Sequence, residues 1–198
     1  MEDIGTASKG SAGSYSASGG GPSGGGAQPP EEQPKRRYSR VFQSTSWRTF
    51  QNVTGNGTGS RTTSVSGPTQ GFTPYYPSAG QYASHYYFDT DDIQARVNGG
   101  EIISARVRFK LTHSHAASGG TARVHLHGHS PRDDWGTPVD YLGEKFFAPG
   151  DRHWIGAKSQ GWATGAVRGI GLWSRGSNST SFYTRYATVA ELELIWEK

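Results

Sequence analysis

The chain has 198 residues, a length that suits one domain with a tail. Its 29 glycines are about twice average usage, only 32% of residues are hydrophobic, and the net charge is +4. That charge is too small to indicate nucleic-acid binding without a clustered patch, and the short basic group at 35–40 marks the boundary between tail and domain. We therefore expect no nucleic-acid partner.

The chain contains no cysteine, which excludes disulfides, thiolate metal sites and thiol nucleophiles. No apolar run approaches the roughly 18 residues of a membrane span. The first ten residues, MEDIGTASKG, lack the basic and apolar regions of a secretory signal. We expect synthesis in a cytoplasm, with any later exposure outside a cell following release inside a particle.

Residues 1–37 are dominated by glycine, serine, alanine and proline. Such a segment buries too little apolar surface to offset the entropy of ordering, so it is predicted to be a flexible tether. Any order in it is expected to come from packing against neighbouring chains.

The first half of the domain is predicted to alternate strands with turns. Residues 38–49 have the composition of a first strand, and residues 62–65 that of a short edge strand. Residues 67–80 combine three prolines with aromatic rings, which is typical of a loop that covers a core or forms a binding surface. Residues 81–88 return to strand composition.

One short helix is predicted at residues 89–97. Thr90 is a candidate cap, and Asp91 and Asp92 suit the positive N-terminal end of a helix. The Asn-Gly-Gly sequence at 98–100 is expected to end it.

The clearest pattern lies at residues 101–129, where apolar and polar residues alternate in two arms. Apolar residues occupy the odd positions from Ile103 to Leu111 and the even positions from Ala122 to Leu126. The glycine-containing link between the arms predicts a central β-hairpin.

The rest of the domain is predicted to be short strands separated by Gly-rich turns, at 139–147, 150–155, 167–173, 181–186 and 189–196. This series predicts an all-β, antiparallel, jelly-roll-like β-sandwich over residues 38–198 with one short helix.

Five histidines near the hairpin are candidate metal ligands: His113, His115, His125, His127 and His129. Alternation places His113 and His115 in the buried register of the first arm, whereas the other three continue the exposed register of the second arm. A bulge at Thr112 is the alternative that brings the two sets together. We expect neither a metal nor another cofactor, with His125, His127 and His129 as the candidates should a metal bind.

Catalytic patterns are weak. The acidic residues at 89–92 are explained by helix capping, and adjacent Asp133 and Asp134 point apart unless their loop folds back. No nucleophile elbow, phosphate loop or zinc-protease motif occurs. We expect no enzymatic activity; the alternative is a small glycan hydrolase.

The chain is rich in aromatic residues, with six tryptophans and ten tyrosines. Several are predicted to lie in or near loops: Tyr75, Tyr76, Trp135, Trp162 and Tyr183. Flat rings with polar neighbours suit sugar faces and protein interfaces alike. These five residues are the predicted contacts for a glycan or a partner subunit.

Residues 38–198 resemble a family of β-sandwich modules in minor tail and tail-fibre-type proteins of tailed bacteriophages. The similar landmarks are Tyr38 and Trp47, Gln70-Gly71, Ser84, Phe88-Asp89, Gly119-Gly120-Thr121-Ala122, the stretch His125–His129, Gly169-Ile170-Gly171-Leu172, and Leu192-Glu193-Leu194-Ile195-Trp196. The resemblance implies a non-enzymatic virion component at a host-facing tip.

The leading hypothesis is therefore a phage minor tail protein, anchored to other virion proteins by residues 1–37 and displayed as a homo-oligomer that contacts a host-surface glycan. The alternatives are a glycan-binding adhesin and a head-decoration or head-fibre protein. A glycan hydrolase or a metal-binding protein is the third hypothesis.

Overall fold

The computed structural model describes residues 34–53, 59–63, 65–73, 80–136, 140–174 and 183–198. Contacts divide the chain into Met1–Pro34 and Lys35–Lys198. The second unit is an antiparallel all-β structure, as predicted. Its strands are β1 (Arg37–Gln51), β2 (Ser60–Thr62), β3 (Thr69–Thr73), β4 (Gly80–Phe88), β5 (Glu101–Ser114), β6 (Gly120–His127), β7 (Asp140–Phe147), β8 (Arg152–Gly156), β9 (Gly169–Leu172), β10 (Thr184–Tyr186) and β11 (Glu191–Glu197), and its helices are α1 (Thr90–Val97) and α2 (Gly161–Thr164).

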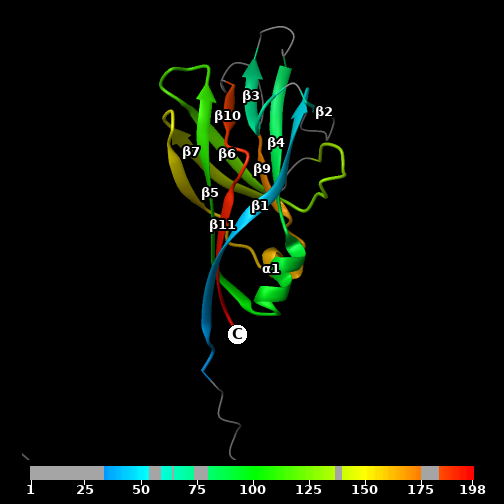
Figure 1. Cartoon of the computed structure of the whole chain (residues 1–198), viewed down its shortest axis with the longest axis vertical. Coiled ribbons are helices and arrows are strands. Elements are labelled where there is room, and N and C mark those ends of the chain that lie inside the picture. Colours follow the sequence, from blue (N-terminus) through cyan, green and yellow to red (C-terminus); the bar gives the residue numbers. More distant parts are fainter. Residues whose placement is uncertain (1–33, 54–58, 64, 74–79, 137–139, 175–182) are drawn as a thin grey trace, which may run out of the picture. The chain divides into compact units, whose positions relative to one another are not determined.

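The strands form two layers that share β1 (Figure 1). Residues Arg37–Gln43 of β1 pair with β11, which continues to β5 and β8. From Ser44 onward the same strand pairs with β4, with an irregularity between Ser44 and Ser46, and its end pairs with β2. This second layer continues through β9 and β6 to β7. Strands β10 and β3 connect β5 to β4 along another side.

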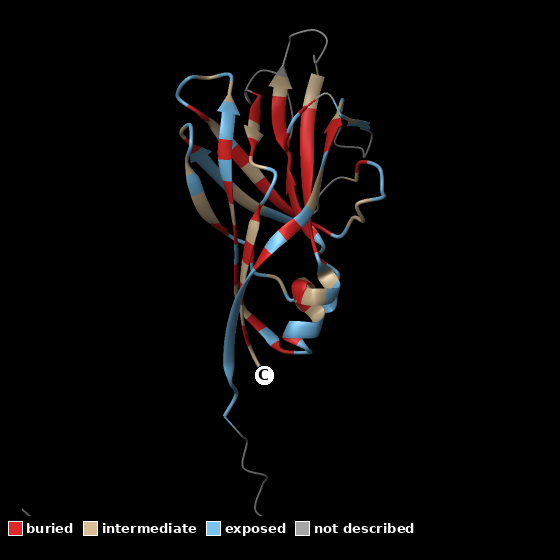
Figure 2. Ribbon diagram, viewed as in Figure 1, coloured by how far each residue is buried: buried red, intermediate tan, exposed pale blue. Residues whose placement is uncertain are grey.

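The apolar core lies between the layers, visible as the buried stripes in Figure 2. In β11, Leu192, Leu194 and Trp196 are buried, while Glu193 and Ile195 between them are only partly buried. In β6 the inward residues are Ala122, Val124 and Leu126. Alternation along β6 and β11 thus supplies one face of each strand to a common core, which is the main stabilising contribution to a fold of this kind.

Helix α1 begins at the predicted place but with a different cap. The side chain of Asp89 accepts hydrogen bonds from the backbone N–H groups of Asp91 and Asp92, so Asp89 and not Thr90 is the N-cap. Asn98 adopts the left-handed conformation and ends the helix, as expected. Helix α2 was not predicted, because a four-residue turn carries almost no periodic signal.

The predicted central hairpin is wrong. Strand β5 bonds to β8, β10 and β11, whereas β6 bonds to β7 and β9, so the link between them crosses from one layer to the other. Gly119 in this link has φ +114°, and an added Cβ would lie 1.9 Å from the backbone oxygen of Phe147. The glycine therefore serves a close backbone approach to β7 rather than a hairpin turn.

Residues 67–80, predicted as a loop, contain the strand β3 at Thr69–Thr73. The prolines on either side of it in the sequence led to the loop prediction, and its position depends on pairing with β4 and β10. The predicted edge strand at 62–65 is replaced by β2, which ends at Thr62.

The two ends of the unit meet at Arg36 and Lys198. The N–H of Arg36 donates to the carbonyl of Lys198 at 2.9 Å, and the N–H of Lys198 donates back at 3.1 Å. The start of β1 therefore lies beside the end of β11 (Figure 1, bottom), and the turn between β5 and β6 lies at the opposite end of the unit.

Candidate functional site

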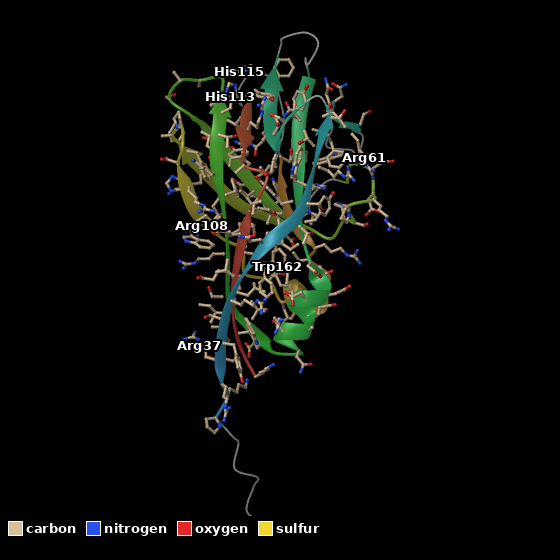
Figure 3. All side chains as sticks on the ribbon, viewed as in Figure 1. Arg37, Arg61, Arg108, His113, His115 and Trp162 are labelled. Carbon is tan, nitrogen blue, oxygen red and sulfur yellow. The ribbon has the colours of Figure 1, made fainter. Side chains whose placement is uncertain are left out.

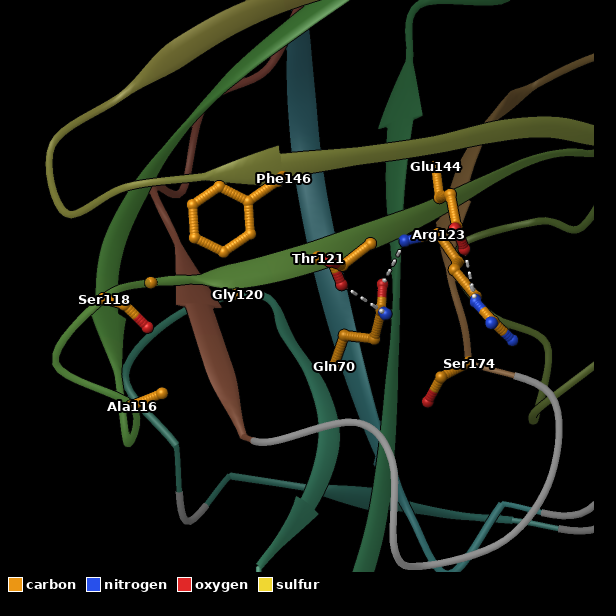
Figure 4. Close-up of a pocket in the computed structure, with 10 residues that line it drawn as sticks. Gln70, Ala116, Ser118, Gly120, Thr121, Arg123, Glu144, Phe146 and Ser174 are labelled. Atoms are coloured by element: carbon orange, nitrogen blue, oxygen red, sulfur yellow. Dashed lines mark hydrogen bonds and ion pairs between the residues drawn. The ribbon is translucent and has the colours of Figure 1, made fainter.

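A polar cleft opens on the outer face of β6 and β7 (Figure 4). It has a volume of about 300 Å³, at the lower end of the range for small-molecule sites. Its lining comes from the β5–β6 link, β6, β7 and the ends of β3 and β9: Gln70, Ala116, Ser118, Gly119, Gly120, Thr121, Arg123, Glu144, Phe146 and Ser174.

Cross-strand pairing builds one wall of the cleft. Thr121 lies opposite Phe146, and Arg123 lies opposite Glu144, so these four side chains share one face of the β6–β7 ladder. Phe146 is 52% exposed, whereas Phe147, which points to the other face, is fully buried. The Nε of Arg123 donates to Oε2 of Glu144 at 2.9 Å.

Gln70 forms the floor. Its Nε2 donates to the carbonyl oxygen of Thr121 at 3.3 Å, and its Oε1 accepts from the N–H of Arg123 at 3.1 Å. Gln70 itself is 1% exposed. The side-chain amide thus satisfies backbone groups of β6 beyond the stretch that pairs with β9, and it fixes the cleft's base.

Beside the cleft, on the same outward face of β6, lies a layer of buried histidines. The rings of His85 and His127 stack at 4.1 Å, and His129 stacks on them at 5.5 Å and 5.8 Å. The Nε2 of His127 pairs with the backbone oxygen of Tyr86 at 3.1 Å. Gly169 makes room for this ring, since a Cβ there would lie 2.5 Å from its Nε2.

Burial governs the charge of this histidine layer. Desolvation lowers the pKa of His127 to about 3, with His129 adding to the decrease and the Tyr86 carbonyl opposing it. Desolvation also holds the pKa of His85 well below its usual value, with further lowering from His127, His129 and His125. These two rings are neutral at physiological pH, and this part of the molecule is a packed layer rather than an acid–base pair.

The two predicted histidine sets stay apart. His113 and His115 are exposed at the end of β5, near the top of Figure 3, where both rings contact Tyr183. The prediction that they are buried is wrong, as is the prediction that His125 and His127 are exposed. A bulge does occur at Thr112, since Leu111 pairs with Tyr186 and His113 with Arg185, and it accompanies the turn of β5 away from the core.

Partial burial and nearby charge also lower the pKa of His113, with Arg185 and His115 acting after desolvation.

Within the part of the chain that the structure describes, no three His, Cys, Asp or Glu side chains converge as a metal site would require. Of the metal candidates, His125 instead pairs through Nε2 with the backbone oxygen of Trp173 at 3.1 Å.

The predicted surface aromatics are packing residues wherever the structure describes them. Trp135 is 4% exposed and contacts Phe50 and His85. Trp162 is fully buried in the main core, where its Nε1 donates to the carbonyl of Ala157 (Figure 3). Tyr183 is 5% exposed and packs edge-on against Tyr82.

The prediction that Trp135, Trp162 and Tyr183 form an exposed binding surface is therefore wrong, because all three side chains are buried within the unit. Tyr75 and Tyr76 lie outside the described residues.

The sequence did hold one signal for the residues that line the cleft. In a strand, adjacent residues face opposite sides, so the Phe146-Phe147 pair must expose one ring unless both faces are covered. The partners of Phe146 carry no such signal, because Gln70 reaches the cleft from a strand that is distant in sequence.

The opposite outer face, on β5, β8 and β11, is also charged, and arginines and glutamates on it form ion pairs with one another. Glu191 accepts from both Arg108 and Arg152, and Arg106 pairs with Glu193. The guanidinium groups of Arg106 and Arg108 lie 4.6 Å and 4.3 Å from the ring centre of Trp154.

No protein-family model and no curated protein matches the chain. A solved structure, the K1 cleaved adhesin domain of Lys-gingipain from Porphyromonas gingivalis W83, aligns at 9% identity over 82% of this chain and 98% of that domain, with a TM-score of 0.26. At this score the likeness carries no argument about function. Among the described residues, no helix has the length and apolar character needed to cross a bilayer.

Proposed function

We propose that this chain is a non-enzymatic structural protein of a bacteriophage virion, a minor tail protein. In this proposal residues 1–37 attach it to other virion proteins, and the β-sandwich at 38–198 contacts the host surface. The sequence resemblance supports the placement in a virion. The observation that carries surface contact is the cleft, an open polar hollow beside a half-exposed phenylalanine.

The cleft's groups suit binding rather than bond cleavage. Glu144 is the one carboxylate among the described lining residues, and it is 50% exposed and paired with Arg123. The lining therefore lacks the second acid that glycoside hydrolysis ordinarily requires. Its other polar groups are hydroxyls, an amide and backbone atoms of the β5–β6 link. A neutral, hydrogen-bonding surface of this kind recognises a ligand without activating it.

Two measurements test the proposal. Mass spectrometry of purified particles should detect the chain, and purified full-length protein should compete with particles for adsorption to host cells. A variant lacking residues 1–34 should keep its melting temperature but be missing from particles. Absence of the wild-type chain from particles would refute the virion role.

A glycan-binding adhesin that works outside a particle is the second candidate, and the same cleft favours it. The particle measurement separates the two, because an adhesin of this kind binds cells without co-purifying with virions.

A further inference from the structure

The cleft has the parts of a sugar site, in positions set by the strand ladder. Residues on one face of a strand are spaced by roughly 7 Å, so the Thr121–Phe146 rung and the Arg123–Glu144 rung lie about that far apart. One rung presents an apolar ring and the other presents hydrogen-bonding groups. A pyranose has the same division, with C–H groups on its faces and hydroxyls at its rim.

The aromatic ring is available to a ligand. Phe146 is 52% exposed and lines the cleft (Figure 4). Trp154 on the opposite face, in contrast, is already occupied by two guanidinium groups. Tyr141, the other strongly exposed ring on β7, is 55% exposed but does not line the cleft.

The charge of the cleft selects among sugars. Arg123 and Glu144 neutralise each other at 2.9 Å. A guanidinium has five N–H donors and a carboxylate about four lone-pair positions, so a pair joined through one atom of each keeps capacity for vicinal hydroxyls. A sugar carboxylate would instead compete with Glu144 for Arg123, and it would meet a like charge.

The floor is rigid enough to hold this arrangement. Gln70 is fixed by two hydrogen bonds to the backbone of β6, and the Oγ of Ser174 accepts from Nε2 of Gln81 at 2.9 Å. Side chains held by such bonds lose little further entropy when a ligand binds.

We propose that this cleft binds one neutral pyranose unit of a surface glycan, with Phe146 stacking on the sugar face and the Arg123–Glu144 pair bonding its hydroxyls. This inference deepens the proposed host-surface contact and rests on it. The ligand class is a neutral hexose or N-acetylhexosamine, and an acidic sugar is disfavoured.

The test uses full-length protein with methyl galactoside, methyl glucoside, N-acetylglucosamine and galacturonate as probes, measured by saturation-transfer NMR and calorimetry. At least one neutral probe should bind more tightly than galacturonate. Phe146→Ala and Phe146→Leu should each weaken that binding by about tenfold, because both remove the ring while Leu keeps an apolar side chain. Tyr141→Ala is the matched control and should bind as wild type.

A charge exchange sharpens the assignment. Glu144→Gln removes the like charge and frees Arg123, so galacturonate should gain affinity several-fold while the neutral probe loses some. Circular dichroism and thermal melting should show all variants folded, since these side chains are half-exposed.

The inference is overturned if no neutral probe binds, or if Tyr141→Ala weakens binding as much as Phe146→Ala. Failure of the inference is distinguishable from failure of the proposed function. If wild type and Phe146→Ala block adsorption equally, host contact stands and the cleft is not its site. If neither blocks adsorption and neither is found in particles, the proposed function fails whatever the probes do.

Discussion

The outward-facing side chains of β6 are at least partly exposed to solvent in the first half of the strand and buried in the second half. Thr121 and Arg123, in the first half, border an open cleft. His125 and His127, in the second half, are 4% and 1% exposed. The difference comes from the chain that follows, because residues 128–136 fold back over the second half and place Trp135 against His85.

This comparison shows that alternation decides which way a side chain points but not whether water reaches it. The covering segment is tied down by Arg61, whose guanidinium donates to the carbonyls of Arg132 and Asp133. The first half of β6 has no such cover among the described residues, and there the exposed ring of Phe146 remains.

The largest effect is expected from removing the anchor of the cover. Trp135→Ala should lower the free energy of unfolding by about 3–5 kcal/mol, because it empties a packed site between Phe50, His85 and Trp173. Urea unfolding measures this loss. Tyr141→Ala is the control and should cost less than about 1 kcal/mol. A small loss for Trp135→Ala would mean that the segment is not held by its tryptophan.

A second effect follows from the neutral histidines beneath the cover. Their folded-state pKa values lie below the ordinary value of 6.5, so the unfolded chain takes up protons first as the pH falls. Stability should therefore decrease below about pH 6.5 and continue to decrease toward the folded pKa of His127, about 3. Between pH 7.5 and 5.5, His127 should cost about 1.4 kcal/mol, and His85 should add to this loss.

Urea unfolding at a series of pH values measures this slope. His127→Gln should reduce the slope, because it removes one of the two buried rings whose folded pKa is lowered. An equal slope in His127→Gln and wild type would contradict the assignment of proton uptake to the buried layer.

A third effect concerns the floor of the open half. Gln70→Leu leaves the carbonyl of Thr121 and the N–H of Arg123 without their partner, at an expected cost of about 1–3 kcal/mol. Thermal melting measures the loss, and sugar binding should weaken with it. Unchanged melting would show that water replaces the amide.

The smallest effect on stability is expected at the half-exposed Arg123–Glu144 pair. Glu144→Gln should change the free energy of unfolding by no more than about 0.5 kcal/mol, because the pair with Arg123 is half-exposed. Glu191→Gln on the opposite face is the contrast. Glu191 accepts from two arginines and its side chain is only 14% exposed, so its loss should cost more. An equal loss of stability in Glu144→Gln and Glu191→Gln would contradict the view that the Glu191 pairs stabilise the fold more than the Arg123–Glu144 pair does.

Much of the strand pattern was predictable because alternation is local. The inward residues of β11 and the second arm of the predicted hairpin, such as Leu192 and Val124, are buried as expected. Strand partners were not predictable from the same pattern, since β5 and β6 alternate equally well whether they pair with each other or with distant strands.

The candidate site was hidden for the same reason. Gln70 and Arg123 come together only in the folded sheet, and the spacing between them in the sequence does not predict their contact. The loop aromatics were wrongly predicted to be exposed, because the sequence around a residue such as Trp135 does not show whether its loop extends into solvent or folds over a sheet. Only the Phe146-Phe147 pair carried a local signal that one ring faces outward.

The sharing of β1 between both layers has a mechanical consequence. A pull on Lys35 directed along β1 would strain its bonds to β11 and β4 at the same time, in shear, instead of opening them one after another. The β5–β6 link, which lines the cleft, lies at the other end of the unit (Figure 1). A load applied between Lys35 and the far end of β1 would therefore act along the longest strand of the unit, the arrangement expected to resist force best.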